Sequence, residues 1–432
     1  MYEFEIEGGY PISGNINLTG GKNSVLPVIA ATLLTDKKCI LQSVPKILDV
    51  RIMLKILQEL GSKVEYINRT DISIENKNIK IHDINNFLFL ISKLRGSILL
   101  LSPLVYRLGS VPFVFPGGDR IGKRELSAHF DGFRQLGLSI KFTNGNFEVS
   151  GRVDKSEVFL YEPSVTATEN ILMLSATKER EIIIENAASE PHVIDLCNML
   201  ISMGAHIEGV GSSVLKIKGK NNLSGMKHVV LKDTIEIATY MIFALMSRGD
   251  LTIKDIHPPY LKSILYVFEK FNTQFEILQN EDSFDIHIPS SQDLYLRDDL
   301  GFNNLGIYTH PYPGFPTDLL APMIVLSTKV KGNILFFEKM YEDRLSFLYP
   351  LKKLGADFKF IDSNRVIIKG GKGLNSGKLK ALDIRSGVSY LAGMISADGK
   401  STLEGVHHIR RGYEHIDTNL NNLGAHIKRI RK

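Results

Sequence analysis

The stretch Leu57-Gln-Glu-Leu-Gly-Ser-Lys-Val64 is the first of six related segments along the chain. In each segment, apolar residues at helical spacing lead to a glycine or asparagine, and an alternating apolar and polar pattern follows. The glycine or asparagine positions are Gly61, Gly137, Gly204, Asn272, Gly355 and Gly424. Because these residue types suit the left-handed backbone that closes many helices, each segment predicts a helix, a tight turn and a strand.

The spacing of the six segments predicts the domain organisation. They recur at intervals of roughly 70 residues, which exceeds the 20–50 residues of most solenoid repeats. Each unit therefore has room for several strands and two helices. Three units per domain give two similar α/β (α+β) domains of about 200 residues, within the usual range for a domain.

Composition narrows the classes of function. The 432 residues are 44% hydrophobic and 23% charged, with a net charge of +5, and no basic run or nucleic-acid-binding motif is present. Two cysteines, Cys39 in an expected strand and Cys197 in an expected helix, can form neither a disulfide framework nor a zinc site. The acidic start and the interruption of the longest apolar passages at Lys93 and Arg95 argue against a signal peptide or membrane span. We expect a cytoplasmic protein without nucleic-acid or membrane partners.

The first chemistry-bearing stretch is Leu18-Thr-Gly-Gly-Lys-Asn-Ser-Val-Leu-Pro27. A strand runs into paired glycines, and Lys22 and Asn23 then open an apolar helical stretch. Amide donors at a helix start, beside a lysine, form an anion site. A plain glycine turn with a solvated lysine is an equally good interpretation of the residues alone.

The second stretch is Gly117-Gly-Asp-Arg-Ile-Gly-Lys123, which nearly matches a phosphate-binding P-loop. Arg124 stands where a P-loop needs Ser or Thr for magnesium, so a nucleotide triphosphatase is disfavoured. The remaining interpretation is a loop that carries Asp119 and several cations and closes over an anionic substrate. An exposed charged loop is the alternative.

Further candidates lie in the C-terminal half. Asp318 follows a proline-rich segment and precedes an apolar helical stretch, so it can be a helix cap or a general base. Arg344, Arg385 and Arg411 each have a carboxylate nearby in the sequence. Each alone is more often part of a salt bridge, whereas several arginines together would favour phosphate or carboxylate binding.

In order along the chain, these motifs resemble the enolpyruvyl transferase (EPSP synthase) family, from about Phe4 to Ile430. The matching stretches include Lys22-Asn23, Leu94-Arg-Gly-Ser97, Pro116-Gly-Gly, Phe315-Pro-Thr-Asp318 and Arg411-Gly-Tyr-Glu414. The resemblance implies the inverse α/β prism fold, with residues 22–230 as one domain that carries an active-site loop over 112–123. Residues 1–21 and 231–432 would form the other domain, with the active site in the interdomain cleft.

The resemblance also implies an activity. The Lys22-Asn23 pair is typical of the branch that transfers the enolpyruvyl group of phosphoenolpyruvate to the 3'-hydroxyl of UDP-N-acetylglucosamine, the first committed step of peptidoglycan synthesis. Phosphate is released, no cofactor or metal is needed, and a monomer is expected. Transfer to shikimate-3-phosphate or a related alcohol, and an inactive protein that only binds sugar nucleotide, are the alternatives.

The family's functional positions carry over residue by residue. The catalytic positions are Asp119, Lys22, Asp318 and Arg411. The phosphoenolpyruvate positions are Lys22, Asn23, Arg124, Arg344, Arg385 and Arg411. The UDP-N-acetylglucosamine positions are Arg95, Arg124, Glu125, Leu126, Ser127, Ala128, Glu162, Pro163, Ser164, Val165, Asp318 and Met340.

The chain departs from the common family pattern at Asp119, where most members have a cysteine. That cysteine is the family's proposed proton donor and the nucleophile that fosfomycin, an epoxide antibiotic, alkylates. The acid role requires a protonated side chain, which burial favours and the neighbouring Arg120 and Lys123 oppose. Because a carboxylate is a poor substitute for a thiolate, we predict insensitivity to fosfomycin.

Overall fold

All six predicted turn residues have a left-handed backbone in the computed structural model, which describes residues 2–117, 125–281, 283–297 and 305–431. Their φ angles are +97° at Gly61, +94° at Gly137, +107° at Gly204, +54° at Asn272, +90° at Gly355 and +102° at Gly424. A helix ends shortly before each residue, and a strand begins shortly after it. The predicted sixfold repetition is confirmed.

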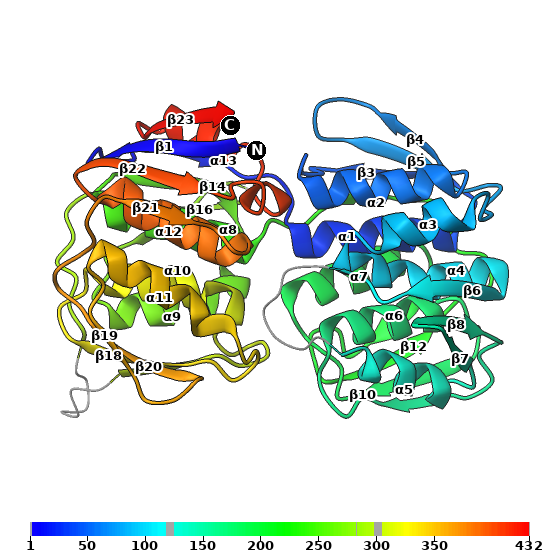
Figure 1. Ribbon diagram of the computed structural model, residues 1–432. Coiled ribbons are helices and arrows are strands. Elements are labelled where there is room, and N and C mark those ends of the chain that lie inside the picture. Colours follow the sequence, from blue (N-terminus) through cyan, green and yellow to red (C-terminus); the bar gives the residue numbers. More distant parts are fainter. Residues whose placement is uncertain (1, 118–124, 282, 298–304, 432) are drawn as a thin grey trace. The chain divides into compact units, whose positions relative to one another are not determined.

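Each repeat supplies one small sheet (Figure 1). The strand after the turn pairs antiparallel with a second strand, the second pairs antiparallel with a third, and in five of the sheets a fourth strand lies parallel to the third. Over the described residues the sheets, in that strand order, are β4 (Lys63–Tyr66), β5 (Ile72–Glu75), β3 (Cys39–Gln42), β13 (Lys227–Val229); β7 (Ser139–Thr143), β8 (Asn146–Ser150), β6 (Ser110–Val114); β11 (His206–Glu208), β12 (Val214–Lys218), β10 (Glu181–Glu185), β9 (Glu157–Phe159); β15 (Glu276–Gln279), β16 (Phe284–Ile288), β14 (Leu251–Ile256), β2 (Gly14–Asn17); β19 (Phe358–Phe360), β20 (Arg365–Lys369), β18 (Asn333–Phe337), β17 (Leu305–Tyr308); and β23 (His426–Arg431), β1 (Tyr2–Gly8), β22 (Gly399–Glu404), β21 (Lys378–Lys380).

Some helices are enclosed by these sheets, and others are partly exposed at the surface. The α-helices of the described chain are α1 (Lys22–Ala31), α2 (Leu48–Glu59), α3 (Ile84–Ile91), α4 (Leu101–Leu108), α5 (Ser127–Gln135), α6 (Val165–Ser175), α7 (Pro191–Ser202), α8 (Thr234–Ser247), α9 (Lys262–Lys270), α10 (Leu320–Ser327), α11 (Leu348–Leu351), α12 (Ile384–Ser396) and α13 (Ile416–Asn422). The 3₁₀ helices are η1 (Thr32–Leu34), η2 (Arg95–Leu100), η3 (Pro258–Leu261), η4 (Thr317–Leu319), η5 (Arg344–Phe347), η6 (Lys352–Leu354) and η7 (Ile409–Arg411).

Three of these helices, α8, α10 and α12, are buried at nearly every residue, as expected of helices that are apolar on all sides. They contact one another, and each also packs against a different sheet: α8 against β14 and β16, α10 against β18 and β20, and α12 against β1 and β22. Figure 1 shows α10 and α12 between the last two of these sheets. The buried helices therefore form the centre of a prism whose faces are sheets.

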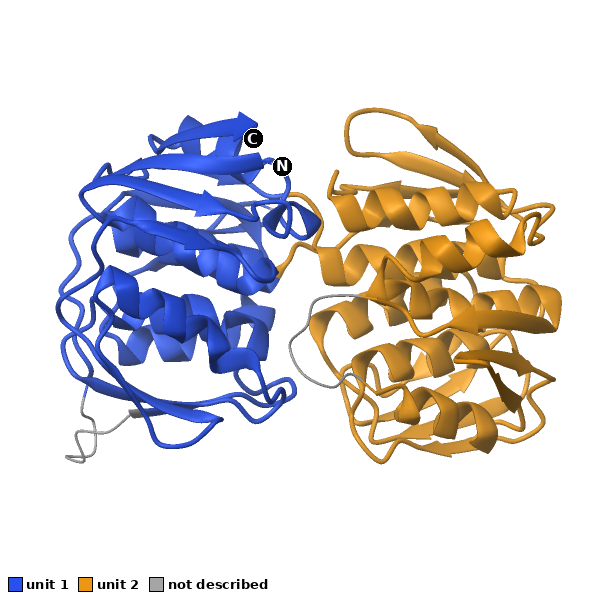
Figure 2. Cartoon of the chain, viewed as in Figure 1, with its two compact units in different colours: residues 1–18, 119–123, 234–432 blue, residues 19–118, 124–233 orange. Residues whose placement is uncertain are grey.

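The chain divides into two compact units, each with its own hydrophobic core (Figure 2). Of the described residues, unit 1 holds 2–18 and 234–431, and unit 2 holds 19–117 and 125–233. Unit 1 is discontinuous because β1 pairs with β23 near the other end of the chain and β2 pairs with β14. In unit 2, β13 returns to pair with β3. No helix in the described part of the chain is long and apolar enough to cross a membrane.

Candidate functional site

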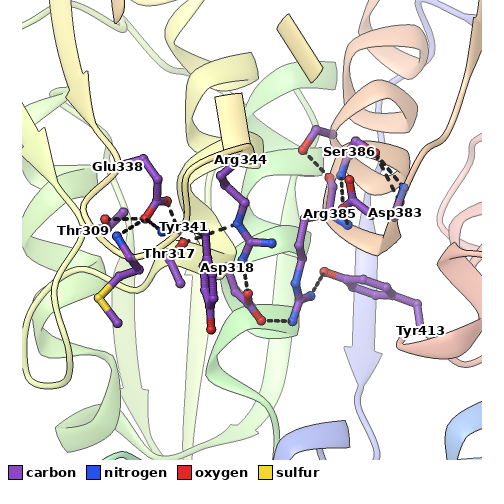
Figure 3. Close-up of polar contacts among 12 residues, drawn as sticks. Thr309, Thr317, Asp318, Glu338, Tyr341, Arg344, Asp383, Arg385, Ser386 and Tyr413 are labelled. Carbon is purple, nitrogen blue, oxygen red and sulfur yellow. Dashed lines mark hydrogen bonds and ion pairs between the residues drawn. The ribbon is translucent and has the colours of Figure 1, made fainter. Parts of the chain in front are cut away.

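Asp318 lies between two guanidinium groups in unit 1 (Figure 3). Its Oδ1 accepts a hydrogen bond from Arg344 Nη2, and its Oδ2 accepts one from Arg385 Nη2 at 2.6 Å. The side chains of Arg344 and Arg385 are 5% and 9% exposed, whereas that of Asp318 is 30% exposed. The structure thus brings together three residues that the sequence predicted for the site, with a net charge of +1 and one partly accessible carboxylate.

The charge state of Asp318 follows from opposing effects. Burial raises the pKa of its carboxyl group, but the charges and hydrogen bonds of Arg385 and Arg344 lower it, and the net pKa lies well below the ordinary value. Asp318 is therefore ionised throughout the neutral range. The helix-cap interpretation is wrong, because Pro316 occupies the cap position of η4 and Asp318 lies within that helix.

Arg344 and Arg385 both pair with a carboxylate distant in the sequence, that of Asp318. Asp383, two residues before Arg385, instead caps α12 by accepting the backbone N–H groups of Arg385 at 2.7 Å and Ser386 at 3.0 Å. Capping directs one carboxylate oxygen of Asp383 to the backbone and starts α12 with Arg385 in its first turn. The Arg385 guanidinium reaches Asp318, 67 residues earlier in the chain.

Tyr413 is a further member of the cluster. Its hydroxyl accepts a hydrogen bond from Arg385 Nη1 at 3.0 Å (Figure 3). The same hydroxyl lies 3.0 Å from Thr239 Oγ1 on α8. The predicted Arg411 ends η7, two residues before Tyr413, and its backbone N–H donates to the carbonyl of His408. Tyr413 therefore holds one edge of the Arg385 guanidinium, and Arg411 belongs to the same segment.

A second carboxylate lies behind the cluster. Glu338 follows β18, is fully buried, and accepts the backbone N–H of Met340 at 2.6 Å and the hydroxyl of Thr317 at 2.6 Å (Figure 3). Thr317 Oγ1 in turn accepts Arg344 Nε at 3.3 Å. Met340, a predicted sugar-nucleotide contact, is 40% exposed.

In unit 2, Lys22 begins α1 as predicted, and Asn23 follows it. Lys22 Nζ lies 2.7 Å from the carboxylate of Asp49 in the first turn of α2. The paired glycines before Lys22 serve a packing role, because a Cβ on Gly21 would lie 2.7 Å from Cβ of Asp233. The helix start and its lysine are therefore held in a defined position, and the solvated-lysine interpretation is wrong.

Several predicted sugar-nucleotide residues also gather in unit 2. Arg95, at the start of η2, donates from Nη2 to the carbonyl of Glu125 at 3.2 Å, and the Glu125 carboxylate accepts the hydroxyl of Ser127 at 3.0 Å. The side chains of Leu126 and Ala128, around the start of α5, are buried, so only their backbone groups suit a polar ligand.

The start of α6 supplies the other predicted segment. Ser164 is the residue before α6, its N–H donates to the carbonyl of Glu162 at 2.7 Å, and Pro163 lies between them. Val165 is the first residue of α6. Tyr161 precedes Glu162, and burial and the charge of Glu162 raise the pKa of its phenol above the ordinary value.

The predicted site residues Asp119 and Arg124, together with Arg120 and Lys123, lie outside the described residues. Of the predicted loop over 112–123, residues 112–114 form the end of β6. Among the described residues, no group of three His, Cys, Asp or Glu side chains is placed to hold a metal ion.

The residues that the sequence analysis missed share one property. Each of them interacts with a predicted site residue or its neighbour, and the interacting residue is distant in the chain or lies in an adjoining loop. These residues are Asp49, Thr317, Glu338, Tyr413 and Tyr161. The available signals were weak: Asp49 and Glu338 are charged residues at otherwise apolar positions, and Tyr413 lies inside the Arg411–Glu414 motif.

Comparison with known proteins identifies the family to which the chain belongs. A solved enolpyruvyl transferase from Streptomyces tendae has the same fold, with a TM-score of 0.87 over 99% of each chain at 19% sequence identity. Residues 6–420 match the family described as EPSP synthase (3-phosphoshikimate 1-carboxyvinyltransferase), and the chain belongs to this family.

Curated relatives that match the chain over its whole length carry a more particular name. A UDP-N-acetylglucosamine 1-carboxyvinyltransferase of Borreliella burgdorferi is 39% identical and covers 100% of each chain. One of Treponema denticola is 37% identical and covers 99% of each chain.

Proposed function

We propose that this protein transfers the enolpyruvyl group of phosphoenolpyruvate to the 3'-hydroxyl of UDP-N-acetylglucosamine and releases phosphate, the committed step of peptidoglycan synthesis. The observation that carries the proposal is the pair of buried arginines around the accessible Asp318 carboxylate. Relatives that match the full chain and bear the name of this activity favour it over transfer to shikimate-3-phosphate. The buried, unlinked thiols of Cys39 and Cys197 suit the reducing cytoplasm, where we place the protein.

The reaction begins with addition of the sugar hydroxyl oxygen to C2 of phosphoenolpyruvate. The hydroxyl proton passes to Asp318, while a proton is delivered to C3, for which Asp119 is the proposed donor. Phosphate then leaves C2 with its bonding electrons as C3 loses a proton and the double bond forms again. Arg344, Arg385 and Lys22 supply positive charge for the phosphate and carboxylate of the substrate.

The ion pairs of Asp318 suggest how its basicity is controlled. The two guanidiniums make it a weak base. When phosphoenolpyruvate accepts hydrogen bonds from Arg344 or Arg385, less positive charge remains directed at Asp318. Its affinity for a proton then rises at the stage where the sugar hydroxyl must lose one.

The sugar nucleotide is assigned to the segments at the starts of α5 and α6. Their backbone N–H groups suit a diphosphate, since helix starts favour negative charge. Glu125, Ser127 and Tyr161 offer polar groups to the rest of the ligand. These residues are the basis for proposing UDP-N-acetylglucosamine as the acceptor.

Phosphate release tests the proposal. The purified protein is assayed with phosphoenolpyruvate and UDP-N-acetylglucosamine, and in parallel with shikimate-3-phosphate. We expect release with the sugar nucleotide and a loss of at least about 100-fold in kcat for Asp318→Ala, the usual contribution of a general base. No release from the wild-type protein at any pH between 5 and 9 would overturn the proposal, and release with shikimate-3-phosphate alone would replace it with the shikimate reaction.

A further inference from the structure

Glu338 makes more hydrogen bonds than the packing of a loop requires (Figure 3). Its buried carboxylate accepts four of them: from the hydroxyls of Thr309 at 2.9 Å and Thr317 at 2.6 Å, and from the N–H groups of Met340 at 2.6 Å and Tyr341 at 3.1 Å. A buried carboxyl group that receives four hydrogen bonds is held in one orientation.

The base of this network is rigid. Glu338 comes directly after β18, and its N–H donates to the carbonyl of Asn364 at 2.9 Å. Thr309 comes directly after β17, the parallel neighbour of β18, and its N–H donates to the carbonyl of Phe337 at 3.0 Å. The carboxylate is thus fixed to the ends of two paired strands.

The network reaches Arg344 by two routes. Thr317 gives its hydroxyl hydrogen to Glu338, so an oxygen lone pair remains to accept Arg344 Nε at 3.3 Å. The hydrogen bond that Glu338 accepts from the Tyr341 N–H fixes the backbone of Tyr341. The ring of Tyr341 lies 5.4 Å from the Arg344 guanidinium carbon, a cation–π distance. The Thr317 hydroxyl contacts the edge of the Arg344 guanidinium, and the Tyr341 ring lies against its face.

We propose that Glu338 is a positioning residue that sets the orientation of the Arg344 guanidinium for the anionic substrate. The inference rests on the proposed function, in which Arg344 binds phosphoenolpyruvate. A guanidinium binds phosphate or carboxylate well only when its planar fork is correctly aligned, so a rotated Arg344 weakens substrate binding even if its charge remains. Glu338 itself touches no substrate in this account.

Thr317 is the point at which this role is separable from folding. Thr317→Val keeps the shape of the side chain but removes the hydroxyl that joins Glu338 to Arg344. We expect KM for phosphoenolpyruvate to rise about tenfold, the usual effect of losing one hydrogen bond to a charged group, while KM for UDP-N-acetylglucosamine stays within about twofold. Thr317→Ser, which keeps the hydroxyl, should restore the wild-type KM.

Thr328→Val is the matched control. Thr328 is also buried in unit 1, and its hydroxyl donates to the carbonyl of Val325 at 2.8 Å, outside the site. This variant should lower Tm without a change in either KM. If Thr317→Val lowers Tm but leaves KM for phosphoenolpyruvate unchanged, the hydroxyl has only a structural role and the proposal is overturned.

A double-mutant cycle tests Glu338 itself. Glu338→Gln replaces one acceptor oxygen by an amide that donates, so the Thr317 hydroxyl is no longer held with its hydrogen toward residue 338. We expect Glu338→Gln to raise KM for phosphoenolpyruvate in the otherwise wild-type protein. In a protein that already carries Thr317→Val, the same substitution should raise this KM much less. Fully additive effects would contradict the route through Thr317. An inactive wild-type protein would instead disprove the proposed function.

Discussion

The ammonium of Lys22 lies 2.7 Å from a carboxylate of Asp49 whose side chain has no exposed surface. Asp49 lies in the first turn of α2, where the helix dipole also stabilises its negative charge. Lys22 is 18% exposed, so its charge is held in place yet remains accessible to a ligand. The buried partner therefore fixes the lysine that we assign to phosphoenolpyruvate.

We expect Asp49→Asn to raise KM for phosphoenolpyruvate about tenfold and to lower the free energy of unfolding by about 1.5–3 kcal/mol, because a close, largely buried ion pair is broken. Steady-state kinetics with phosphoenolpyruvate as the varied substrate, together with urea denaturation, measure both effects. Glu65→Gln is the control, because it breaks the exposed Lys63–Glu65 pair of the same unit. Equal KM values for the two variants would contradict the assignment.

The pH dependence of the reaction should differ between the free enzyme and its substrate complex. The pKa of Asp318 lies well below its ordinary value, so in the free enzyme Asp318 remains the base form down to low pH. It should therefore contribute no acid limb to kcat/KM above about pH 4. If bound phosphoenolpyruvate draws Arg344 and Arg385 away, the pKa of Asp318 rises and an acid limb appears in kcat at higher pH. Coincident acid limbs in the two profiles would contradict this control of basicity.

The fold was predictable because its signals are local. A glycine or asparagine that closes a helix adopts its left-handed backbone mainly through its own conformational freedom, and the strand pattern after it needs no distant information. Six copies of such a signal determine the number of units. The pairing of β1 with β23 had no comparable signal in the residues, because it joins the two ends of the chain.

The site was predictable in its residue types but not in its contacts. Asp383 is next to Arg385 in the sequence, yet it caps α12 and leaves Arg385 to pair with Asp318. Glu338 and Asp49 looked like ordinary charged residues because their partners lie on other elements. Such partner choices depend on tertiary packing, which no spacing rule in the sequence contains.

Neither native cysteine should react with alkylating reagents in the folded protein. Burial raises the pKa of Cys39 to about 11 and that of Cys197 to about 12, so at pH 8 about one thiol in a thousand or fewer is the reactive thiolate. Mass spectrometry after iodoacetamide treatment should find no adduct in the native protein and two in urea. Ser363→Cys, at an exposed position, is the positive control. An adduct at Cys39 or Cys197 without urea would disprove the prediction.

His129 should make the protein sensitive to acid. It lies in α5 with 2% exposure, and both ring nitrogens lack a hydrogen-bond partner among the described residues. Burial, with a smaller effect of Arg95, lowers the pKa of His129 to about 3. The unfolded chain therefore binds a proton below about pH 6.5 that the folded chain does not, and stability falls by about 1.4 kcal/mol per pH unit from there toward pH 3.

Urea denaturation between pH 7 and pH 5 measures this effect. His129→Phe should flatten the decline in the free energy of unfolding, because no proton is then gained on unfolding at that position. His82→Gln, at an exposed position, is the control: its free energy of unfolding should decline with falling pH as steeply as that of the wild-type protein. An unchanged slope in His129→Phe would show that another group governs the loss of stability.

Fosfomycin should not inactivate this protein. Alkylation by the epoxide requires a strong nucleophile, and Asp119 offers a carboxylate at the position where the resemblance implies a thiol in most members. The native cysteines provide no substitute, because both are buried and their raised pKa values keep them protonated. Asp119→Cys should stay active and lose activity over time with fosfomycin, with a single adduct at residue 119 by mass spectrometry. A covalent adduct on Asp119 in the wild type, or a folded but inactive Asp119→Cys, would refute the shared role of this position.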